Sequence, residues 1–212
     1  MMKKNTIYNH RVQFANQKLD ELFPLAPNKI ISDVGAGFGH MQAKIEGIGA
    51  AWQPFDYFKK MDKSIVWDLN NPAPSNIKKA GIVVFLEVLE HLANPLIGIN
   101  NIKNHIEKDG YLILSVPNPS WSRSRLNLLL KGTLFSFQPK HIEEHHVFVP
   151  WFHIVEYFLK ENGFELLEYA IIDEPSKPQT LKERIKRSIE KYIESKDIRA
   201  RGLSYGIVAK KL

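Results

Sequence analysis

Three glycines and an aspartate in this chain have types and spacing that suit a nucleoside-containing ligand. Gly35, Gly37 and Gly39 lie between a predicted strand and a predicted helix. Glycine permits a tight turn there and lets a ligand approach the main chain, while the N-terminus of the helix offers free N–H groups. Asp56 ends the next predicted strand, where its carboxylate can accept both hydroxyls of a ribose across the sheet edge.

The spacing of these glycines leaves two classes of ligand open. The fingerprint of dinucleotide-binding proteins is G-x-G-x-x-G. Here the third glycine, Gly39, comes one place early, and His40 occupies the position that the fingerprint requires. The spacing disfavours a nicotinamide dinucleotide without excluding it. A structural turn followed by an unrelated surface aspartate is the remaining interpretation.

A second group of chemically capable side chains follows a fully apolar run at residues 81–86. Glu87, Glu90 and His91 are spaced i, i+3 and i+4, so one helical turn would place them on one side. His91 suits a general base, with Glu90 beside it, because imidazole titrates in the useful range. Two carboxylates and an imidazole also suit a divalent metal, although we assign none. Capping or packing of the turn is the structural alternative.

The elements that must position these residues alternate between strand and helix patterns. Such alternation predicts an α/β fold, with a mostly parallel sheet covered by helices on both faces. Asn94 and Pro95 form a typical helix start, and Gly163 follows a helix end. The predicted strands are residues 29–34, 50–55, 64–67, 81–86, 111–116, 164–172 and 203–210, and the predicted helices begin near residues 7, 40, 95, 150 and 181.

The composition narrows the class of protein. The chain has 212 residues, 44% of them hydrophobic and 25% charged, which excludes intrinsic disorder. Because cysteine is absent, disulfides, thiol catalysis and thiolate zinc sites are excluded. No apolar run approaches the ~20 residues of a membrane-spanning helix. The first residues lack the apolar segment of a secretory signal, so we expect a cytoplasmic protein.

The net charge of +6 is concentrated near the C-terminus. Residues 177–201 carry nine basic and four acidic side chains, whereas the rest of the chain is close to neutral. Such a segment can attract anionic lipid, nucleic acid or an acidic partner, or it can be a solvated helix face. Residues 119–148 combine many leucine and aromatic side chains with basic ones. Together the two segments predict an amphipathic or lipid-linked substrate and peripheral contact with an anionic membrane. Packing of these leucines on the core is the alternative interpretation.

Five motifs follow one another along residues 28–118: Asp33–Gly39, Asp56, Trp67-Asp68-Leu69, Val84–Leu92 and Asp109–Asn118. In this order they resemble the motifs of class I S-adenosylmethionine-dependent methyltransferases. Within that family the chain is similar to the small bacterial methyltransferases that include the ubiquinone-biosynthesis O-methyltransferases. Gly81 departs from the pattern, because relatives usually carry an acidic residue there.

This resemblance implies S-adenosyl-L-methionine as the cofactor and gives each matching residue a role. For two of these residues a purely structural interpretation stands beside the role below: ordinary surface packing for Tyr57, and capping of a turn for Asp68. By resemblance, Asp33 and the main chain of Gly35, Ala36, Gly37 and Gly39 hold the methionyl end, Asp56 binds the ribose, Tyr57 lies against the adenine, Asp68 accepts the adenine amino group with Leu69 beside it, and the carbonyl of Leu86 lies near the amino group of the cofactor.

The resemblance also implies a Rossmann-like sheet of seven strands, of which the last runs antiparallel. We expect one domain over residues 1–212, with a lid-like insertion at about 119–148 and a basic helical insertion at about 177–201. The implied function is methylation, most simply of an oxygen on a small molecule or on a glycan or lipid intermediate.

Three other functions remain open. An RNA methyltransferase with a Glu-x-x-Glu-His metal site, completed by His145 or His146, is one alternative. Nucleic acid is nevertheless an unlikely partner, because no aromatic-interleaved RNA-binding motif is recognisable. The others are a nicotinamide-dependent oxidoreductase and a binding module that uses the fold without turnover.

Overall fold

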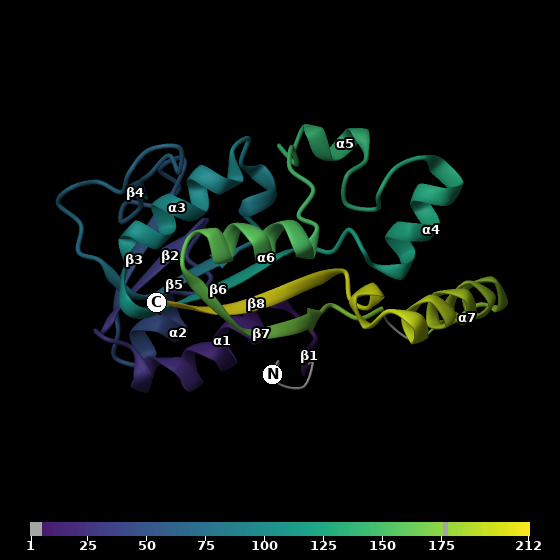
Figure 1. Cartoon of the computed structure of the whole chain (residues 1–212), viewed down its shortest axis with the longest axis horizontal. Coiled ribbons are helices and arrows are strands. Elements are labelled where there is room, and N and C mark those ends of the chain that lie inside the picture. The colour runs from purple at the N-terminus through teal and green to yellow at the C-terminus, as the bar shows by residue number, and fades with distance from the viewer. Residues whose placement is uncertain (1–5, 176–177) are drawn as a thin grey trace.

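The computed structural model describes residues 6–175 and 178–212, which form an eight-stranded mixed sheet with the order β1-β7-β8-β6-β5-β2-β3-β4 (Figure 1). Neighbouring strands are parallel, except that β8 runs antiparallel to both β6 and β7. The α/β class and the antiparallel last strand are therefore confirmed. The strands are β1 (Thr6–Tyr8), β2 (Ile30–Val34), β3 (Ala51–Asp56), β4 (Ile65–Val66), β5 (Ala80–Leu86), β6 (Ile106–Pro117), β7 (Phe164–Ile172) and β8 (Ser204–Lys211).

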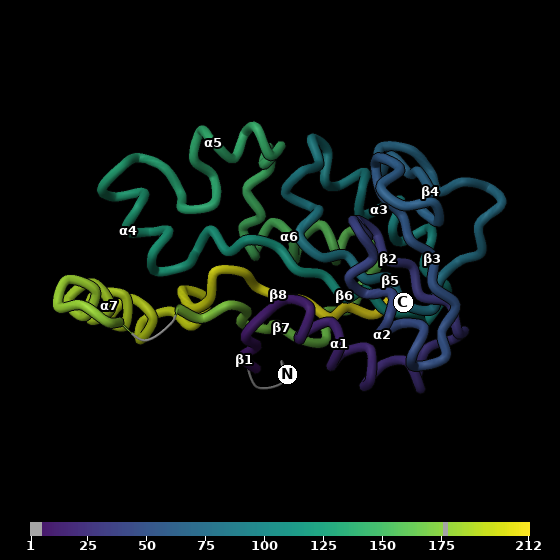
Figure 2. Tube along the Cα trace, turned by 180° about the vertical axis from the view of Figure 1, so that it is seen from behind, coloured from purple at the N-terminus to yellow at the C-terminus, as the bar shows by residue number. Residues whose placement is uncertain are grey.

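Helices cover both faces of this sheet. On one face lie α1 (Arg11–Leu22) and α2 (Gln42–Gly47), and on the other lie α3 (Pro95–His105) and α6 (Phe152–Glu161) (Figures 1 and 2). Each face has its own buried core, which explains why β5 is apolar along its whole length. Phe14, Leu19 and Ile45 belong to the first core, and Ile99, Ile102, Val155 and Leu159 belong to the second.

The expectation of seven strands was wrong, because β1 adds an edge strand. The pattern from residue 7 onward predicted helix, yet β1 pairs with β7 and α1 begins only at Arg11. The side chain of His10 caps α1 by accepting the N–H of Val12 at 3.2 Å. Tyr8 is buried and meets Phe14 edge to face, with ring centroids 5.2 Å apart. The backbone groups of Thr6–Tyr8 therefore find their hydrogen-bond partners in β7, and not in an earlier start of α1.

Asp109-Gly110, a pair of residues typical of turns, lies within a strand. β6 begins directly after α3, at Ile106, and its pairing with β5 shifts register between Ala80 and Ile82. Asp109 accordingly has a positive φ of 63°. The turn-forming residues therefore make a local irregularity in a long strand, as in a β-bulge.

Gly81, the residue that departs from the related sequences, has a close neighbour at the start of β5. Its N–H donates to the side-chain oxygen of Asn28 at 2.8 Å. A Cβ at this position would lie 2.6 Å from the main-chain oxygen of Asn28. The main chain and the side chain of Asn28 thus occupy the space that a larger residue at position 81 would need.

Two helical segments extend beyond the sheet at its carboxyl edge (Figure 1). One follows β6 and contains α4 (Ser122–Lys131) and α5 (Pro139–Ile142); the other connects β7 to β8 and contains α7 (Leu181–Lys196). Three short 3-10 helices, η1 (Phe23–Leu25), η2 (Leu89–His91) and η3 (Ile198–Ala200), complete the chain. None of the helices in the described ranges is long and apolar enough to cross a membrane. Residues 1–5 and 177, where the predicted domain and basic insertion begin, fall outside those ranges.

Candidate active site

The glycine loop joins β2 to α2 with three positive φ angles, of 82°, 57° and 80° at Gly35, Gly37 and Gly39. The N–H groups of Gly35 and Ala36 both donate to the carbonyl of Phe55 at 2.9 Å, which fixes the loop against β3. A Cβ on Gly35 would lie 2.3 Å from Cγ2 of Val88, whereas a Cβ on Gly37 would meet no atom within 4 Å. Packing therefore requires glycine at position 35, and the space beside Gly37 is open to a ligand.

Asp56 lies against this loop, at the end of β3. Its Oδ2 accepts the N–H of Gly37 at 2.9 Å and lies 3.3 Å from Nζ of Lys60. Among the residues that the structure describes, only Phe58 contacts its Oδ1, through a long N–H contact of 3.5 Å. The carboxylate is thus held in place by one oxygen while the other remains available to the hydroxyls of a bound ribose.

Asp33 forms a second acidic site, at the end of β2. It is buried, and Nε1 of Trp52 donates to its Oδ2 at 3.3 Å. Burial raises the pKa of Asp33 to about 6; the bond from Trp52 opposes this shift and the charge of Asp56 adds to it. Two neighbouring carboxylates at the carboxyl ends of β2 and β3 favour a ligand that carries positive charge.

The other residues predicted to contact the cofactor differ in the solvent exposure of their side chains. Tyr57 is 59% exposed, and its ring meets Phe58 with centroids 4.7 Å apart. Leu86 is half-buried at the end of β5. Leu69 is buried, and its carbonyl accepts from the side chain of Asn101 at 2.9 Å.

Asp68 binds within its own turn, as the capping alternative predicts. Its Oδ1 accepts the main-chain and side-chain N–H groups of Asn70 at 3.0 and 2.8 Å, and its Oδ2 accepts from the side chain of Asn71 at 3.1 Å. Both carboxylate oxygens of Asp68 already accept hydrogen bonds, so an adenine amino group could bind only to the lone pairs that these bonds leave free.

The predicted grouping of Glu87, Glu90 and His91 on one helical turn is only partly present. Glu87 has a left-handed φ of 53° and precedes η2, so its side chain turns toward the sheet. There it accepts the hydroxyl of Ser115 at 2.8 Å and that of Ser204 at 3.4 Å. The change of backbone direction at residue 87 therefore separates Glu87 from the other two.

His146 takes the third place in this group, which we call the acid–imidazole cluster: Glu90, His91 and His146. Their ligand atoms all lie within 4.8 Å of one another, and the two imidazole centroids are 4.9 Å apart. The N–H groups of Val147 and Phe148 both donate to the carbonyl of Glu90 at 3.0 Å. The segment after α5 is thereby fastened to η2, which brings His146 to His91.

The hydrogen bonds made by the cluster show which of its nitrogen and oxygen atoms still have a lone pair to offer. Nδ1 of His146 lies 2.9 Å from the carbonyl of Ser136, and because a carbonyl only accepts, Nδ1 carries the proton and Nε2 has the lone pair. Nε2 of His91 lies 3.9 Å from Oε1 of Glu90. Oε2 of Glu90 is buried without a hydrogen-bond partner in the part of the chain that the structure describes.

Burial determines the charge states of the cluster. It raises the pKa of Glu90 well above its ordinary value, and the charge of Glu87 adds to this shift. It lowers the pKa of His91, and the neighbouring His146 adds to that shift. A neutral imidazole at His91 is able to accept a proton from a hydroxyl.

Three residues of the site were missed in the sequence. Lys60 lies four positions after Asp56, a spacing that could have suggested the ion pair. Trp52 and Val88 gave no such signal, because their contacts with Asp33 and Gly35 come from strand pairing and from packing across the sheet edge.

Comparison with known proteins identifies the family. Residues 8–169 match the methyltransferase domain family, and the chain belongs to it. Ubiquinone biosynthesis O-methyltransferases from Haemophilus ducreyi and Actinobacillus pleuropneumoniae are 27% and 24% identical to it over 157 residues. Each match covers 66% of this chain and 65% of the relative, so the chain spans slightly less than two thirds of these relatives.

Solved structures agree with this family at the level of the fold. An S-adenosylmethionine-dependent methyltransferase from Archaeoglobus fulgidus has a TM-score of 0.64 at 18% identity, covering 94% of both chains. One from Mesorhizobium loti has a TM-score of 0.58 at 14% identity, covering 92% of this chain and 96% of the other. The expected Rossmann-like methyltransferase fold is confirmed, and S-adenosyl-L-methionine is the cofactor that the family implies. Family membership thus disfavours the nicotinamide alternative.

Proposed function

We propose that this chain transfers the methyl group of S-adenosyl-L-methionine to an oxygen atom of a small molecule or of a glycan or lipid intermediate. The observation that carries the proposal is the contact between Asp56 and Gly37, beside a loop that is open at Gly37. The named O-methyltransferase relatives favour oxygen as the acceptor atom. The acid–imidazole cluster supports the same choice, because a hydroxyl must lose its proton.

When bound, the cofactor supplies an electrophilic methyl group, and the chain supplies position and charge. We assign Asp33 and the loop to the methionyl end and Asp56 to the ribose. Around the adenine we place Tyr57, Asp68 and Leu69, and the carbonyl of Leu86 lies on the methionyl side. Holding the reacting atoms in line can contribute on the order of 7–11 kcal/mol to lowering the barrier.

His91 is the proposed general base, and its Nε2 takes the proton of the acceptor hydroxyl. Glu90 lies beside it, and burial keeps the imidazole neutral before the transfer. We propose residues 119–148 as the lid over the acceptor. Support comes from the paired bonds of Val147 and Phe148 to Glu90, which join the end of that segment to the cluster.

A metal-assisted reaction is the second candidate. The unpaired buried Oε2 of Glu90 and the lone pairs of His91 and His146 fit a divalent cation, which would be held by these three residues and would bind an acceptor oxygen. The RNA methyltransferase alternative requires Glu87 as well, and this cluster contains the rest of that site, Glu90 and His91 with the additional His146. Excess chelator distinguishes the candidates: full activity after chelation excludes the metal, and loss of activity restored by Mg²⁺ excludes the metal-free reaction.

The cofactor assignment is tested by calorimetric titration with S-adenosylhomocysteine. We expect Asp56→Asn to weaken binding about 10–100-fold, because hydrogen bonds to a charged group contribute about 1.5–3 kcal/mol. Asp62→Asn, an exposed position, is the control and should bind normally. Equal affinity of the Asp56 variant and the wild type would contradict the assignment.

Turnover is tested by transfer of radiolabelled methyl groups to lipid, RNA and small-molecule fractions of a lysate. We expect labelling of lipid or small molecules, and a loss of about 10²–10⁴-fold in kcat for His91→Asn with unchanged affinity for S-adenosylhomocysteine. Labelling of RNA alone would favour the RNA alternative. Tight cofactor binding without labelling of any fraction would favour the binding module.

A further inference from the structure

The apolar stripe of α7 lies on its outward face. Leu181, Ile185 and Ile189 recur every four residues and are 74%, 59% and 48% exposed. Tyr192 belongs to the same stripe and is 66% exposed. An amphipathic helix in a globular protein ordinarily turns such a stripe toward the core. In the described part of the chain, nothing covers this one.

The inward face of α7 is polar and is paired with α4. Glu190 is fully buried and accepts from Arg123 of α4 at 2.8 Å and from Arg187 at 3.2 Å. Glu194 accepts the hydroxyl of Ser122 at 2.8 Å and also pairs with Arg187 at 2.5 Å. These bonds fix the orientation of the helix, and they neutralise two of its acidic groups.

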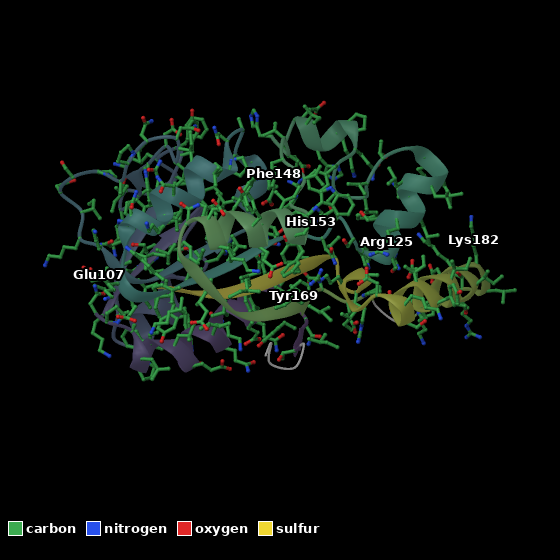
Figure 3. All side chains as sticks on the ribbon, in the orientation of Figure 1. Glu107, Arg125, Phe148, His153, Tyr169 and Lys182 are labelled. Atoms are coloured by element: carbon green, nitrogen blue, oxygen red, sulfur yellow. The ribbon has the colours of Figure 1, made fainter. Side chains whose placement is uncertain are left out.

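Basic side chains border the apolar stripe on both sides. Successive helical residues are about 100° apart, so Lys182 and Lys186 flank one edge and Arg184 and Lys191 flank the other. All four are exposed, and none has an ion-pair partner within residues 6–175 and 178–212. Figure 3 shows Lys182 projecting from the end of the molecule. The outward surface is therefore apolar along its centre and positive along its edges.

We propose that this face of α7 docks peripherally on an anionic lipid bilayer. Both figures of the backbone place α7 beyond the sheet and beside α4, at one end of the molecule, where a flat surface can approach it (Figures 1 and 2). Leu129 and Leu130 of α4 add apolar surface there, at 81% and 78% exposed. Three of the four stripe residues are branched aliphatic side chains, which suit insertion among lipid headgroups. RNA binding needs stacking groups beside the basic ones, and the stripe contributes a single aromatic ring, that of Tyr192. The proposal does not depend on methyl transfer.

The test is flotation of the full chain with vesicles of phosphatidylcholine alone or mixed with phosphatidylglycerol, without cofactor. We expect binding to the mixed vesicles only. Ile185→Gln/Ile189→Gln should weaken it by at least about tenfold. Lys182→Gln/Lys186→Gln should weaken it about 30-fold. Ile97→Gln and Lys78→Gln/Lys79→Gln change exposed residues elsewhere and should bind as the wild type does.

Several results would overturn the proposal. They are binding to neither vesicle, equal binding to both vesicles, or equal losses in the α7 variants and their controls. Salt-dependent binding of RNA without vesicle binding would assign the surface to nucleic acid instead. A wild-type dimer that Ile185→Gln/Ile189→Gln converts to a monomer, again without vesicle binding, would assign it to a second copy of the chain. Circular dichroism confirms that each variant keeps its helices.

Discussion

At the scale of single residues, Asp33 is a buried acid that reduces the stability of the fold. Its carboxylate is buried beside Asp56, with one bond from Trp52. Its pKa of about 6 lies above the ordinary value of 3.8. The folded state therefore holds the proton more tightly than the unfolded chain does. As pH rises from about 4 to about 6, the unfolded chain loses this proton first, so the free energy of unfolding falls.

Asp33→Asn should stabilise the protein at pH 7.5 without ligand. The variant removes the cost of ionising a buried acid, on the order of 1–3 kcal/mol. At pH 4 the acid is protonated in the folded state, so most of this difference should disappear. Urea unfolding at both pH values measures the effect, with Asp62→Asn as the control. An equal difference at the two pH values would show that titration of Asp33 is not its cause.

At the scale of elements, two glycines of the same loop differ in what surrounds them. Gly35 and Gly37 both have positive φ, but only at Gly35 would a Cβ meet a neighbour, Cγ2 of Val88 at 2.3 Å. The two glycines are therefore required for different reasons. At Gly35 the reason is the close packing of the loop against Val88, and at Gly37 it is the backbone angle and the open space.

Alanine substitutions distinguish these two reasons. Gly37→Ala should cost only about 1–2 kcal/mol of stability, from its backbone angle, but should weaken binding of S-adenosylhomocysteine at least about tenfold. Gly35→Ala should cost more, because a clash is added, and Val88→Ala in the same chain should recover part of that loss. Thermal unfolding and calorimetry measure both effects. Normal cofactor affinity in Gly37→Ala would show that the open space is not the binding site.

Elements with local signals could be predicted from the sequence. The Asn94 cap, the apolar run of β5 and the boundaries of β7 lie where the sequence places them. The edge strand β1 and the bulged start of β6 could not be predicted, since each depends on a partner strand distant in sequence. In the site, Asp56 lies beside the loop as expected. His146 lies beside His91 because of the short helix η2 and the left-handed backbone of Glu87 before it. No rule of sequence spacing indicates either feature.

At the scale of the whole molecule, buried ion pairs hold the α4–α7 end together. Glu190 is fully buried between two arginines, whereas Arg125 and Asp197 form a more exposed pair nearby. Removing one partner of a buried pair leaves a charge without compensation. The attachment of α7 therefore depends on polar contacts with α4 more than on an apolar core of its own.

Arg123→Ala should loosen α7 while the sheet stays folded. We expect a local cost of about 1–3 kcal/mol, since Arg187 still pairs with Glu190. Hydrogen exchange should accelerate in residues 181–196 and remain unchanged in β6 and β8. Lys160→Ala breaks an exposed i,i+4 pair and should cost at most about 0.5 kcal/mol. Equal exchange in wild type and Arg123→Ala would show that the pair does not hold the helix.

The excursion between β7 and β8 closes on itself, because the N–H of Leu203 donates to the carbonyl of Asp173 at 3.0 Å. The chain thus leaves the sheet and returns beside its point of departure. Evolution can then lengthen, recharge or remove the intervening helix without changing how the strands align. The surface at this end of the molecule can therefore change independently of the strands that carry the glycine loop.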